Sequence, residues 1–202
     1  THELSKFMQH VLSRMDFTRD LHFHTQTTID TLDYSGEGLN SGSKVVFAAA
    51  GEVKRNLASS VPANMPLPDG FKKTRLAIPG VLALESPQYA SPGATEKEVS
   101  DLNAALSSAD LTEIALIVLC DDADFTAKSI NNLVWVSFTR SNPATDIYGI
   151  GSFTKDKHWG CTGPVIIDAR KKPHHAPELL MDESVAQGIE RFFKNGASLS
   201  SF

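Results

Sequence analysis

Seven consecutive apolar residues, Ile114 to Cys120, constrain the fold more than any other feature of the sequence. Asp121 and Asp122 end the run directly, so it falls far short of the roughly 20 residues that a membrane-spanning helix needs. An unbroken apolar run of this length that is rich in β-branched residues is typical of a strand buried on both faces. It predicts an α/β fold in which helices cover both sides of a sheet.

Two periodicities precede this strand. Apolar residues at helical spacing predict an amphipathic helix over residues 4–15, and alternation predicts a half-buried strand over residues 21–29. Residues 44–57 are predicted as a helix because four apolar side chains would share one face, namely Val46, Ala49, Val53 and Leu57.

Prolines dominate the next stretch, residues 59–92, which contains six of them. Only short strands fit between them, at 75–78 and 81–84, because proline removes a backbone donor. We interpret this stretch as an inserted arm or a connection and not as a second domain.

Helix and strand signals continue to the end of the chain. Thr95 and Glu98 form a capping box that predicts a helix start. Further elements are a helix over 130–138 that ends before Asn142-Pro143 and strands over 146–150 and 165–168. A final helix is predicted over 183–194, with Asp182 as its cap and Gly196 as its stop. Arg140, at the end of one helix, is expected to pair with Asp146 or Asp121.

The predicted fold is a three-layer α/β sandwich with a mixed sheet flanked by helices, plus an inserted Pro-rich arm. The chain divides into a lead-in (1–57), an insertion (58–112), an α/β core (113–195) and a tail (196–202).

Composition excludes several classes of partner. A net charge of −5 gives no cationic field for nucleic acid, and no apolar run is long enough for a membrane span. Two cysteines make neither a disulfide framework nor a zinc set, which favours a reducing, cytoplasmic compartment. The first residues contain no initiator Met and no secretory leader, so we expect a trimmed fragment.

Two sequence motifs resemble ligand sites. The loop from Gly36 to Lys44 resembles a phosphate-binding P-loop, but Ser43 precedes the lysine and Val45 follows it, so the required glycine and hydroxyl are missing. His22 and His24 lie two apart on one strand face with no third metal ligand nearby, which favours solvent-facing histidines.

Other polar groups have both a chemical and a structural interpretation. Asp121, Asp122 and Asp124 follow the central strand and could hold magnesium, yet a carboxylate is also favoured at the N-terminus of the next helix, and we favour this structural role. His174 and His175 are interpreted as exposed loop residues, and Cys161 as an inert thiol. No Ser-His-Asp or Cys-His set follows from order or spacing.

Several segments together resemble the C-terminal domain of the UbiD family of decarboxylases. They share the family's order and gaps: an apolar strand ending in aspartates, an aliphatic-Trp helix step, a Thr-Arg helix end, and then, in the family, an acidic residue, Pro and a later Asp. These segments are Ile117–Asp122, Asn132–Trp135, Thr139–Arg140 and Asn142–Asp146. The segment Gly163–Arg170 resembles the family's Gly-x-Asp-Ala-Thr motif. The resemblance covers residues 114–193 well and 44–57 loosely.

Three positions depart from the family pattern. Ala123 replaces a third aspartate, Asn142 stands where aspartate is common, and Arg170 replaces the threonine after Asp168-Ala169. These departures concern the choice of substrate more than the fold.

The resemblance implies a carboxy-lyase that decarboxylates aromatic or α,β-unsaturated acids, as in ubiquinone or menaquinone biosynthesis. It implies prenylated FMN, a divalent metal (Mn or Mg) and potassium as cofactors, with the protein supplying placement and acid–base groups. The family's Glu-Arg-Glu network and its metal and phosphate ligands belong to its N-terminal and central regions, which this chain does not match. We therefore expect no catalytic, cofactor-binding or metal-binding residue here.

The part played by this chain would be one wall of the substrate cleft and much of a homo-oligomer interface. The candidates for the wall are Trp159, Thr162, Asp168 and Lys171; a structural loop with Asp168 capping a turn is an equal alternative. The expected partner is the missing N-terminal part of the same enzyme, and the isolated chain should bind no cofactor and be inactive. A non-catalytic dimerisation module is the second hypothesis, and a P-loop-like nucleotide binder the third.

Overall fold

A computed structural model describes residues 3–33, 35–36, 38–176, 182–194 and 198. Its centre is a five-stranded mixed sheet in the order β3-β4-β5-β9-β6. The strands are β3 (Thr74–Ile78), β4 (Val81–Glu85), β5 (Leu116–Cys120), β9 (Val165–Asp168) and β6 (Ile147–Gly149). Strands β4, β5 and β9 run parallel, whereas β3 and β6 pair antiparallel at the two edges.

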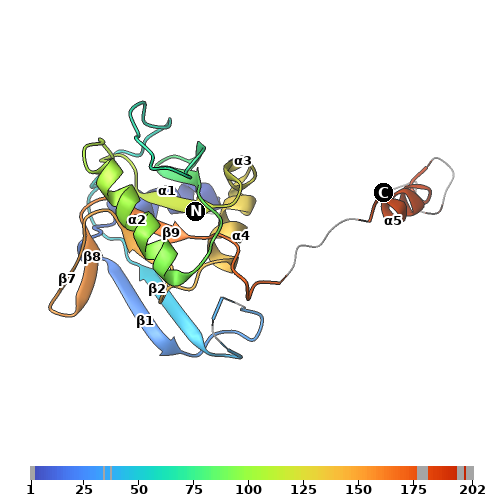
Figure 1. Ribbon diagram of the computed structural model, residues 1–202, viewed down its shortest axis with the longest axis horizontal. Coiled ribbons are helices and arrows are strands. Elements are labelled where there is room, and N and C mark those ends of the chain that lie inside the picture. Colours follow the sequence, from blue (N-terminus) through green and yellow to red (C-terminus); the bar gives the residue numbers. More distant parts are fainter. Residues whose placement is uncertain (1–2, 34, 37, 177–181, 195–197, 199–202) are drawn as a thin grey trace.

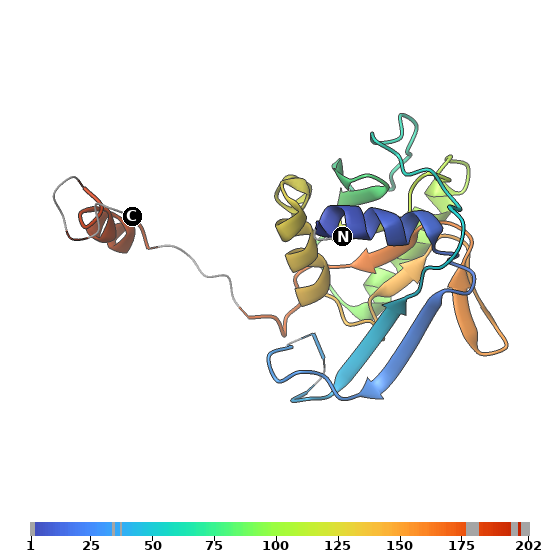
Figure 2. The same ribbon diagram turned by 180° about the vertical axis from the view of Figure 1, so that it is seen from behind.

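The predicted central strand and the three-layer arrangement are confirmed. All five residues of β5 are buried, as an apolar strand with a helix on each side requires. Helix α2 (Pro92–Leu106) covers one face (Figure 1), and α1 (Leu4–Arg14) and α4 (Ile130–Thr139) cover the other (Figure 2). Two apolar clusters result, one on each side of the sheet.

Two antiparallel ribbons extend from this body: β1 (Leu21–Thr27) with β2 (Gly42–Phe47), and β7 (Ser152–Lys155) with β8 (His158–Cys161). The helix predicted for residues 44–57 is therefore wrong. Ser43, Val45 and Phe47 alternate with more exposed neighbours, as in a strand. The segment pairs with β1 and forms a strand despite the apparent helical spacing of its apolar residues.

Residues 58–112 supply β3, β4 and α2, so much of the Pro-rich stretch packs within the core. The start of α2 also differs from the prediction. Ser91 caps the helix by accepting a hydrogen bond from the Ala94 amide at 3.2 Å, and Thr95, predicted as the cap, is buried one turn further on. Thr95 and Glu98, three positions apart on α2, do not cap the helix but accept hydrogen bonds from Arg170.

The remaining elements are short. The helix start expected beside the aspartates belongs to a short separate helix, α3 (Ala123–Ala127), with Asp122 as its N-cap. Helix α5 (Glu183–Glu190) is capped by Asp182 as predicted but ends at Glu190, and the predicted stop at Gly196 lies outside the described residues. Within the described residues, no helix is both long and apolar enough to cross a membrane.

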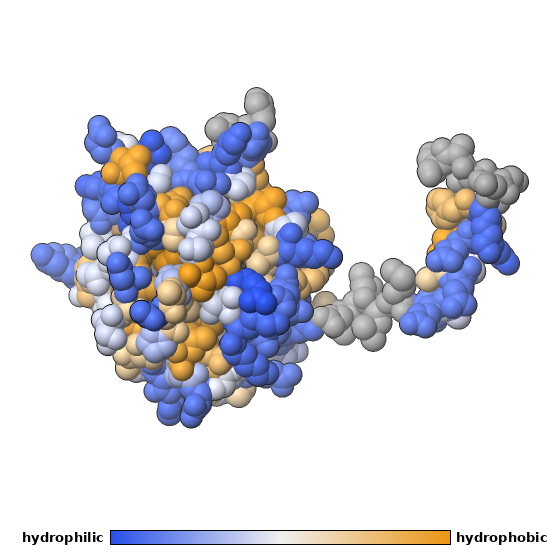
Figure 3. Space-filling view, turned by 90° about the horizontal axis from the view of Figure 1, so that it is seen from above, coloured by the Kyte–Doolittle hydropathy of each residue, from blue (hydrophilic) through white to orange (hydrophobic). Residues whose placement is uncertain are grey.

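Apolar side chains also reach the surface. Figure 3 shows them gathered in one region of the face that it presents, with polar side chains around them. Large exposed apolar side chains occur on α1, α3, α4 and α5, namely Leu4, Phe7, Phe125, Trp135, Phe138, Val185 and Ile189.

Candidate functional site

The carboxyl ends of β4, β5 and β9 meet at one edge of the sheet, which is where open α/β sheets usually bind ligands. A polar cavity of about 400 Å³ lies here. Polar lining residues come from the segments after β4 and β9, from α2, from the connection between α4 and β6, and from β6 itself, namely Tyr89, Thr95, Asn142, Asp146, Tyr148, Lys172 and His174.

Arg170 lies beside this cavity with its side chain fully buried. It binds Asp168 with two hydrogen bonds, from Nε to Oδ1 at 2.8 Å and from Nη2 to Oδ2 at 2.9 Å. Glu98 Oε2 at 2.6 Å, Thr95 Oγ1 at 2.8 Å and the Pro87 carbonyl at 2.8 Å accept the other three N–H groups. Burial opposes the charged guanidinium, but the Asp168 and Glu98 carboxylates outweigh it and raise the pKa of Arg170.

Lys172 forms a second buried ion pair at the same edge. Its Nζ lies 3.3 Å from Asp146 Oδ2 and donates to the carbonyls of Arg140 and Asp168, both at 3.0 Å. Burial raises the pKa of Asp146, although the Lys172 ammonium opposes the shift. Burial also raises the pKa of Tyr148 to about 12, which keeps this phenol protonated.

These residues can position a small polar ligand, but they do not fit the phosphate of a flavin. All five N–H groups of Arg170 have acceptors, and the Lys172 ammonium faces three oxygens of this chain. Among the residues that the structure describes, no group of three or more His, Cys, Asp or Glu side chains could hold a metal ion.

The aspartates after β5 have structural partners. Asp121 accepts from Arg140 Nη1 at 3.1 Å, which confirms one of the two partners predicted for Arg140. Asp122 caps α3 by accepting from the Phe125 amide at 2.9 Å, and Asp124 pairs with Lys73 and Arg75. The structural interpretation of these carboxylates therefore describes them better than a magnesium site.

The four predicted cleft residues do not line one cavity. Asp168 is buried in the ion pair with Arg170, whereas Lys171 is exposed and its backbone amide donates to Asp121. Trp159 lies on β8 and contacts Phe23 edge-on, with ring centroids 5.4 Å apart. Thr162 is exposed at the opening of a different cavity, beside Gly163 and Pro164.

Sequence reasoning missed Arg170 as an organising residue. It treated this arginine only as a departure from a family motif. The i, i+3 spacing of Thr95 and Glu98 was a usable signal, because it places two acceptors on one face of a helix. The arginine that they bind lies more than 70 positions away, so the pairing became visible only in the fold.

The structure also places the P-loop-like segment and Cys161. The loop from Gly36 to Lys44 leads into strand β2 and not into a helix, so the P-loop interpretation lacks its helix N-terminus. Cys161 is buried, and burial raises the pKa of its thiol to about 12, so it stays protonated and unreactive at neutral pH.

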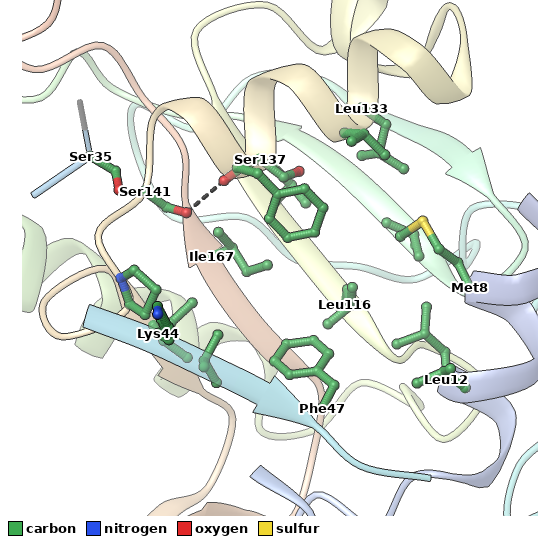
Figure 4. Close-up of a pocket in the computed structure, with 18 of the residues that line it drawn as sticks. Met8, Leu12, Ser35, Lys44, Phe47, Leu116, Leu133, Ser137, Ser141 and Ile167 are labelled. Carbon is green, nitrogen blue, oxygen red and sulfur yellow. Dashed lines mark hydrogen bonds between the residues drawn. The ribbon is translucent and has the colours of Figure 1, made fainter. Parts of the chain in front are cut away.

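A second cavity, about 460 Å³ in volume, lies between α1, α4, β2 and the sheet. Figure 4 shows apolar side chains at one end and polar groups at the other. The labelled apolar residues are Met8, Leu12, Phe47, Leu116, Leu133 and Ile167, and the polar ones are Ser35, Lys44, Ser137 and Ser141. This cavity could receive an apolar group, but it offers no catalytic pair.

His175, interpreted from the sequence as an exposed loop residue, is instead partly buried beside the polar cavity, so it should make stability depend on pH. Its Nδ1 accepts from the Lys172 amide at 3.1 Å, and its buried Nε2 has no hydrogen-bond partner. Burial, reinforced by the charges of Lys172 and Arg140, lowers the pKa of His175 from 6.5 to about 4. Below about pH 6.5 the unfolded chain therefore binds a proton that the folded chain does not, so stability falls as the pH drops toward 4.

Between neutral and acidic pH, we expect the His175→Asn variant to lose about 1–2 kcal/mol less stability than the wild type. Asparagine keeps an acceptor for the Lys172 amide. The expected difference is smaller than the free energy that corresponds to the full pKa shift, because the ring is only partly buried. Urea unfolding at a series of pH values would measure it, with the exposed His10→Asn as the matched control. Parallel curves for the wild type and His175→Asn would contradict the assignment.

Comparison with known proteins places the chain in a family context. Residues 1–49, which include α1, β1 and β2, match the family model of the C-terminal domain of 3-octaprenyl-4-hydroxybenzoate carboxy-lyase, or UbiD. This segment lies before residues 114–193, on which the sequence resemblance mainly rests.

Relatives among curated proteins match most of the chain. A Chlamydia trachomatis protein is 33% identical over 174 residues, covering 86% of this chain and 28% of that protein. A Chlamydia pneumoniae protein named as a subunit of 4-hydroxybenzoate decarboxylase is 30% identical over 185 residues, covering 92% of this chain and 30% of that protein. The chain thus spans about 30% of the length of these relatives.

One similar solved structure is the vanillic acid decarboxylase of Sedimentibacter hydroxybenzoicus in its open form. It is 16% identical, the match covers 56% of this chain and 27% of that chain, and the TM-score is 0.32. The sequence match and the relatives confirm the resemblance: residues 1–49 carry UbiD C-terminal domain sequence, and most of the chain is homologous to a protein named as a 4-hydroxybenzoate decarboxylase subunit.

Proposed function

We propose that the chain is the C-terminal part of a UbiD-type carboxy-lyase that decarboxylates aromatic or α,β-unsaturated acids with prenylated FMN, a divalent metal and potassium. The observation that carries the proposal is the homology of 92% of the chain to a protein named as a decarboxylase subunit, together with the UbiD match at residues 1–49. The cofactors and the acid–base groups would belong to the remaining part of the enzyme.

In this proposal the chain supplies a rigid support at the edge of the substrate cleft. The Arg170–Asp168 and Lys172–Asp146 pairs fix the segment after β9, which carries the exposed Lys171. Lys171, Trp159 and Thr162 remain proposed wall residues, whereas Asp168 would act by holding Arg170. Buried and fully hydrogen-bonded charge pairs keep a loop in one geometry, which positioning of a substrate requires.

A non-catalytic interaction module is the second candidate, and exposed apolar side chains favour it. Val185 and Ile189 on α5 are 54% and 50% exposed, and Phe192 and Phe193 just after the helix are 40% and 49% exposed. Val185 and Ile189 are four positions apart and share one face of α5, and the two phenylalanines follow directly after the end of the helix. The two functions are compatible, because an oligomer interface is part of the proposed decarboxylase.

The isolated chain should fold but neither retain prenylated FMN nor release carbon dioxide. Loss of a positioned proton donor and of electrostatic stabilisation each commonly costs about 10²–10⁴ in rate, so turnover should be undetectable. The chain would be mixed with prenylated FMN, manganese and potassium, and followed by gel filtration and by carbon dioxide release from cinnamate and 4-hydroxybenzoate. Stoichiometric flavin retention, or turnover above a protein-free control, would show that the cofactor site lies within this chain.

A further inference from the structure

The cavity of about 460 Å³ between α1, α4, β2 and the sheet reaches deep into the apolar core (Figure 4). Its inner wall is made of side chains that are no more than 4% exposed, namely Leu12, Val81, Leu116, Val118, Leu133 and Ile167. Protein interiors are close-packed and contain few voids larger than a water molecule. An apolar cavity of about 150 Å³ already binds benzene, so this one, about three times larger, has room for a longer apolar molecule. We name it the α1–α4 chamber.

The α1–α4 chamber has an apolar end, a polar end and an opening to solvent. Figure 4 shows apolar side chains at the end near Met8 and polar groups at the end near Ser35 and Lys44. Phe7 on α1 and Phe138 on α4 also line the chamber and are 52% and 58% exposed, so a ligand can enter beside these two rings. A molecule with an apolar chain and one polar end matches this division.

Ser137 brings an unpaired polar group into the buried wall. The residue is 4% exposed, and its hydroxyl makes no hydrogen bond within the described part of the chain, although its carbonyl accepts one from Ser141. The described side-chain atoms that are both fully enclosed and unpaired are His158 Nε2 and His175 Nε2. The Ser137 hydroxyl is thus unpaired without being enclosed, and because Ser137 lines the chamber, this hydroxyl faces its open space. A desolvated hydroxyl gains free energy when a ligand supplies the missing hydrogen bond.

The charged side chains at the polar end have opposite signs. Lys44, on β2, forms no ion pair in the described part of the chain. Asp33 accepts from the Ser35 amide at 2.9 Å and from its hydroxyl at 2.6 Å. One ammonium and one carboxylate favour neither an anion nor a cation. A charged group beside the buried Ser137 would lose its water without gaining a dedicated counter-charge, whereas a hydroxyl needs only a hydrogen bond.

We propose that the α1–α4 chamber binds a long-chain primary alcohol, with its straight alkyl chain against the apolar walls and its hydroxyl hydrogen-bonded to Ser137. This ligand class differs from the aromatic and unsaturated acids proposed for the whole enzyme. Binding is measured on this chain without a cofactor, so the failure of either proposal leaves the other standing.

1-Octanol is the probe, and the methyl group of Met8 is the reporter, because this side chain lines the chamber. The chain has four methionines, and the signal that a Met8→Leu variant lacks identifies Met8 in a carbon–proton NMR spectrum. This signal should shift saturably with 1-octanol. 1-Hexanol should bind about tenfold more weakly, since each methylene removed from water contributes a similar increment of free energy.

Two variants locate the ligand within the chamber. Ser137→Ala should weaken 1-octanol binding about fivefold by removing one hydrogen bond. Val134→Phe, which adds volume to the α4 wall, should weaken it by at least about tenfold. Ser100→Ala, on the exposed surface of α2 across the sheet, is the matched control and should leave the affinity unchanged. If Val134→Phe loses the native circular dichroism, Ser137→Ala still decides, because it removes a group without a partner in the described part of the chain.

Charged analogues of the same chain length test the head group. Octanoate and octylammonium, at neutral pH, should each bind at least about fivefold more weakly than 1-octanol, because their charges lose solvation beside Ser137. Four results would each overturn the proposal: no saturable shift of the Met8 signal, 1-hexanol binding as tightly as 1-octanol, a charged analogue binding as tightly as 1-octanol, or an affinity that Ser137→Ala leaves unchanged.

Discussion

Replacing Arg170 by Met should lower the free energy of unfolding by about 3–5 kcal/mol, because it leaves a buried carboxylate without its partner. Asp168 has no exposed surface, and Arg170 supplies both of the side-chain donors that bind its two oxygens. Glu98, Thr95 and the Pro87 carbonyl lose a donor in the same variant. Methionine keeps an unbranched side chain of similar length, so the change mainly removes charge and hydrogen bonds.

The double variant Arg170→Met/Asp168→Asn should recover part of this loss, since it removes the unpaired charge. Lys97→Met is the matched control: Lys97 pairs with Asp101 on the surface, where it is 75% exposed, and such pairs contribute about 0–1 kcal/mol. Urea unfolding followed by circular dichroism gives the free energies of unfolding of Arg170→Met, of the double variant and of Lys97→Met, each compared with the wild type. An Arg170→Met variant that loses no more than Lys97→Met would show that the buried network is not a source of stability.

The elements predicted best from the sequence are those in which burial determines every side chain. Residues Ile114 to Cys120 are all apolar, and a strand between two layers of helices accommodates such a run. Helix 130–138 and strands 75–78 and 81–84 were also predicted nearly to the residue, because Asn142-Pro143 and Pro79-Gly80 mark their boundaries.

Prediction was wrong where a local pattern supports two structures. Val46, Ala49 and Val53 fit a helical face, but Val45 and Phe47 fit the inner face of a strand, and the pairing with β1 decided between them. The capping box at Thr95 was wrong for a similar reason. The same two side chains can bind a helix N-terminus or a distant arginine, and local spacing cannot distinguish these partners.

The candidate site was less predictable than the fold. The cleft residues were chosen because they follow one another along the chain, whereas the fold separates Trp159 on a ribbon from Asp168 inside the sheet. Contacts between Arg170 and Glu98, or between Trp159 and Phe23, join segments that share no sequence pattern. Such contacts follow from topology, which local periodicity does not determine.

The second large effect concerns activity in a complete enzyme. In the Chlamydia pneumoniae protein named as a 4-hydroxybenzoate decarboxylase subunit, deletion of the segment that this chain matches should lower decarboxylation by at least about 10²-fold, because small displacements at a reacting centre already cost that much. Inserting this chain in place of the segment should restore the rate to within about tenfold of the parent. The matched control inserts the corresponding segment of the Chlamydia trachomatis relative.

Carbon dioxide release from 4-hydroxybenzoate by this chimaera, loaded with prenylated FMN, manganese and potassium, is the most direct test that the chain is the C-terminal part of a decarboxylase. The account predicts a rate close to that of the parent and of the control chimaera, and far above that of the deletion variant. A folded, flavin-loaded chimaera that releases no more carbon dioxide than the deletion variant, while the control chimaera remains active, would contradict it.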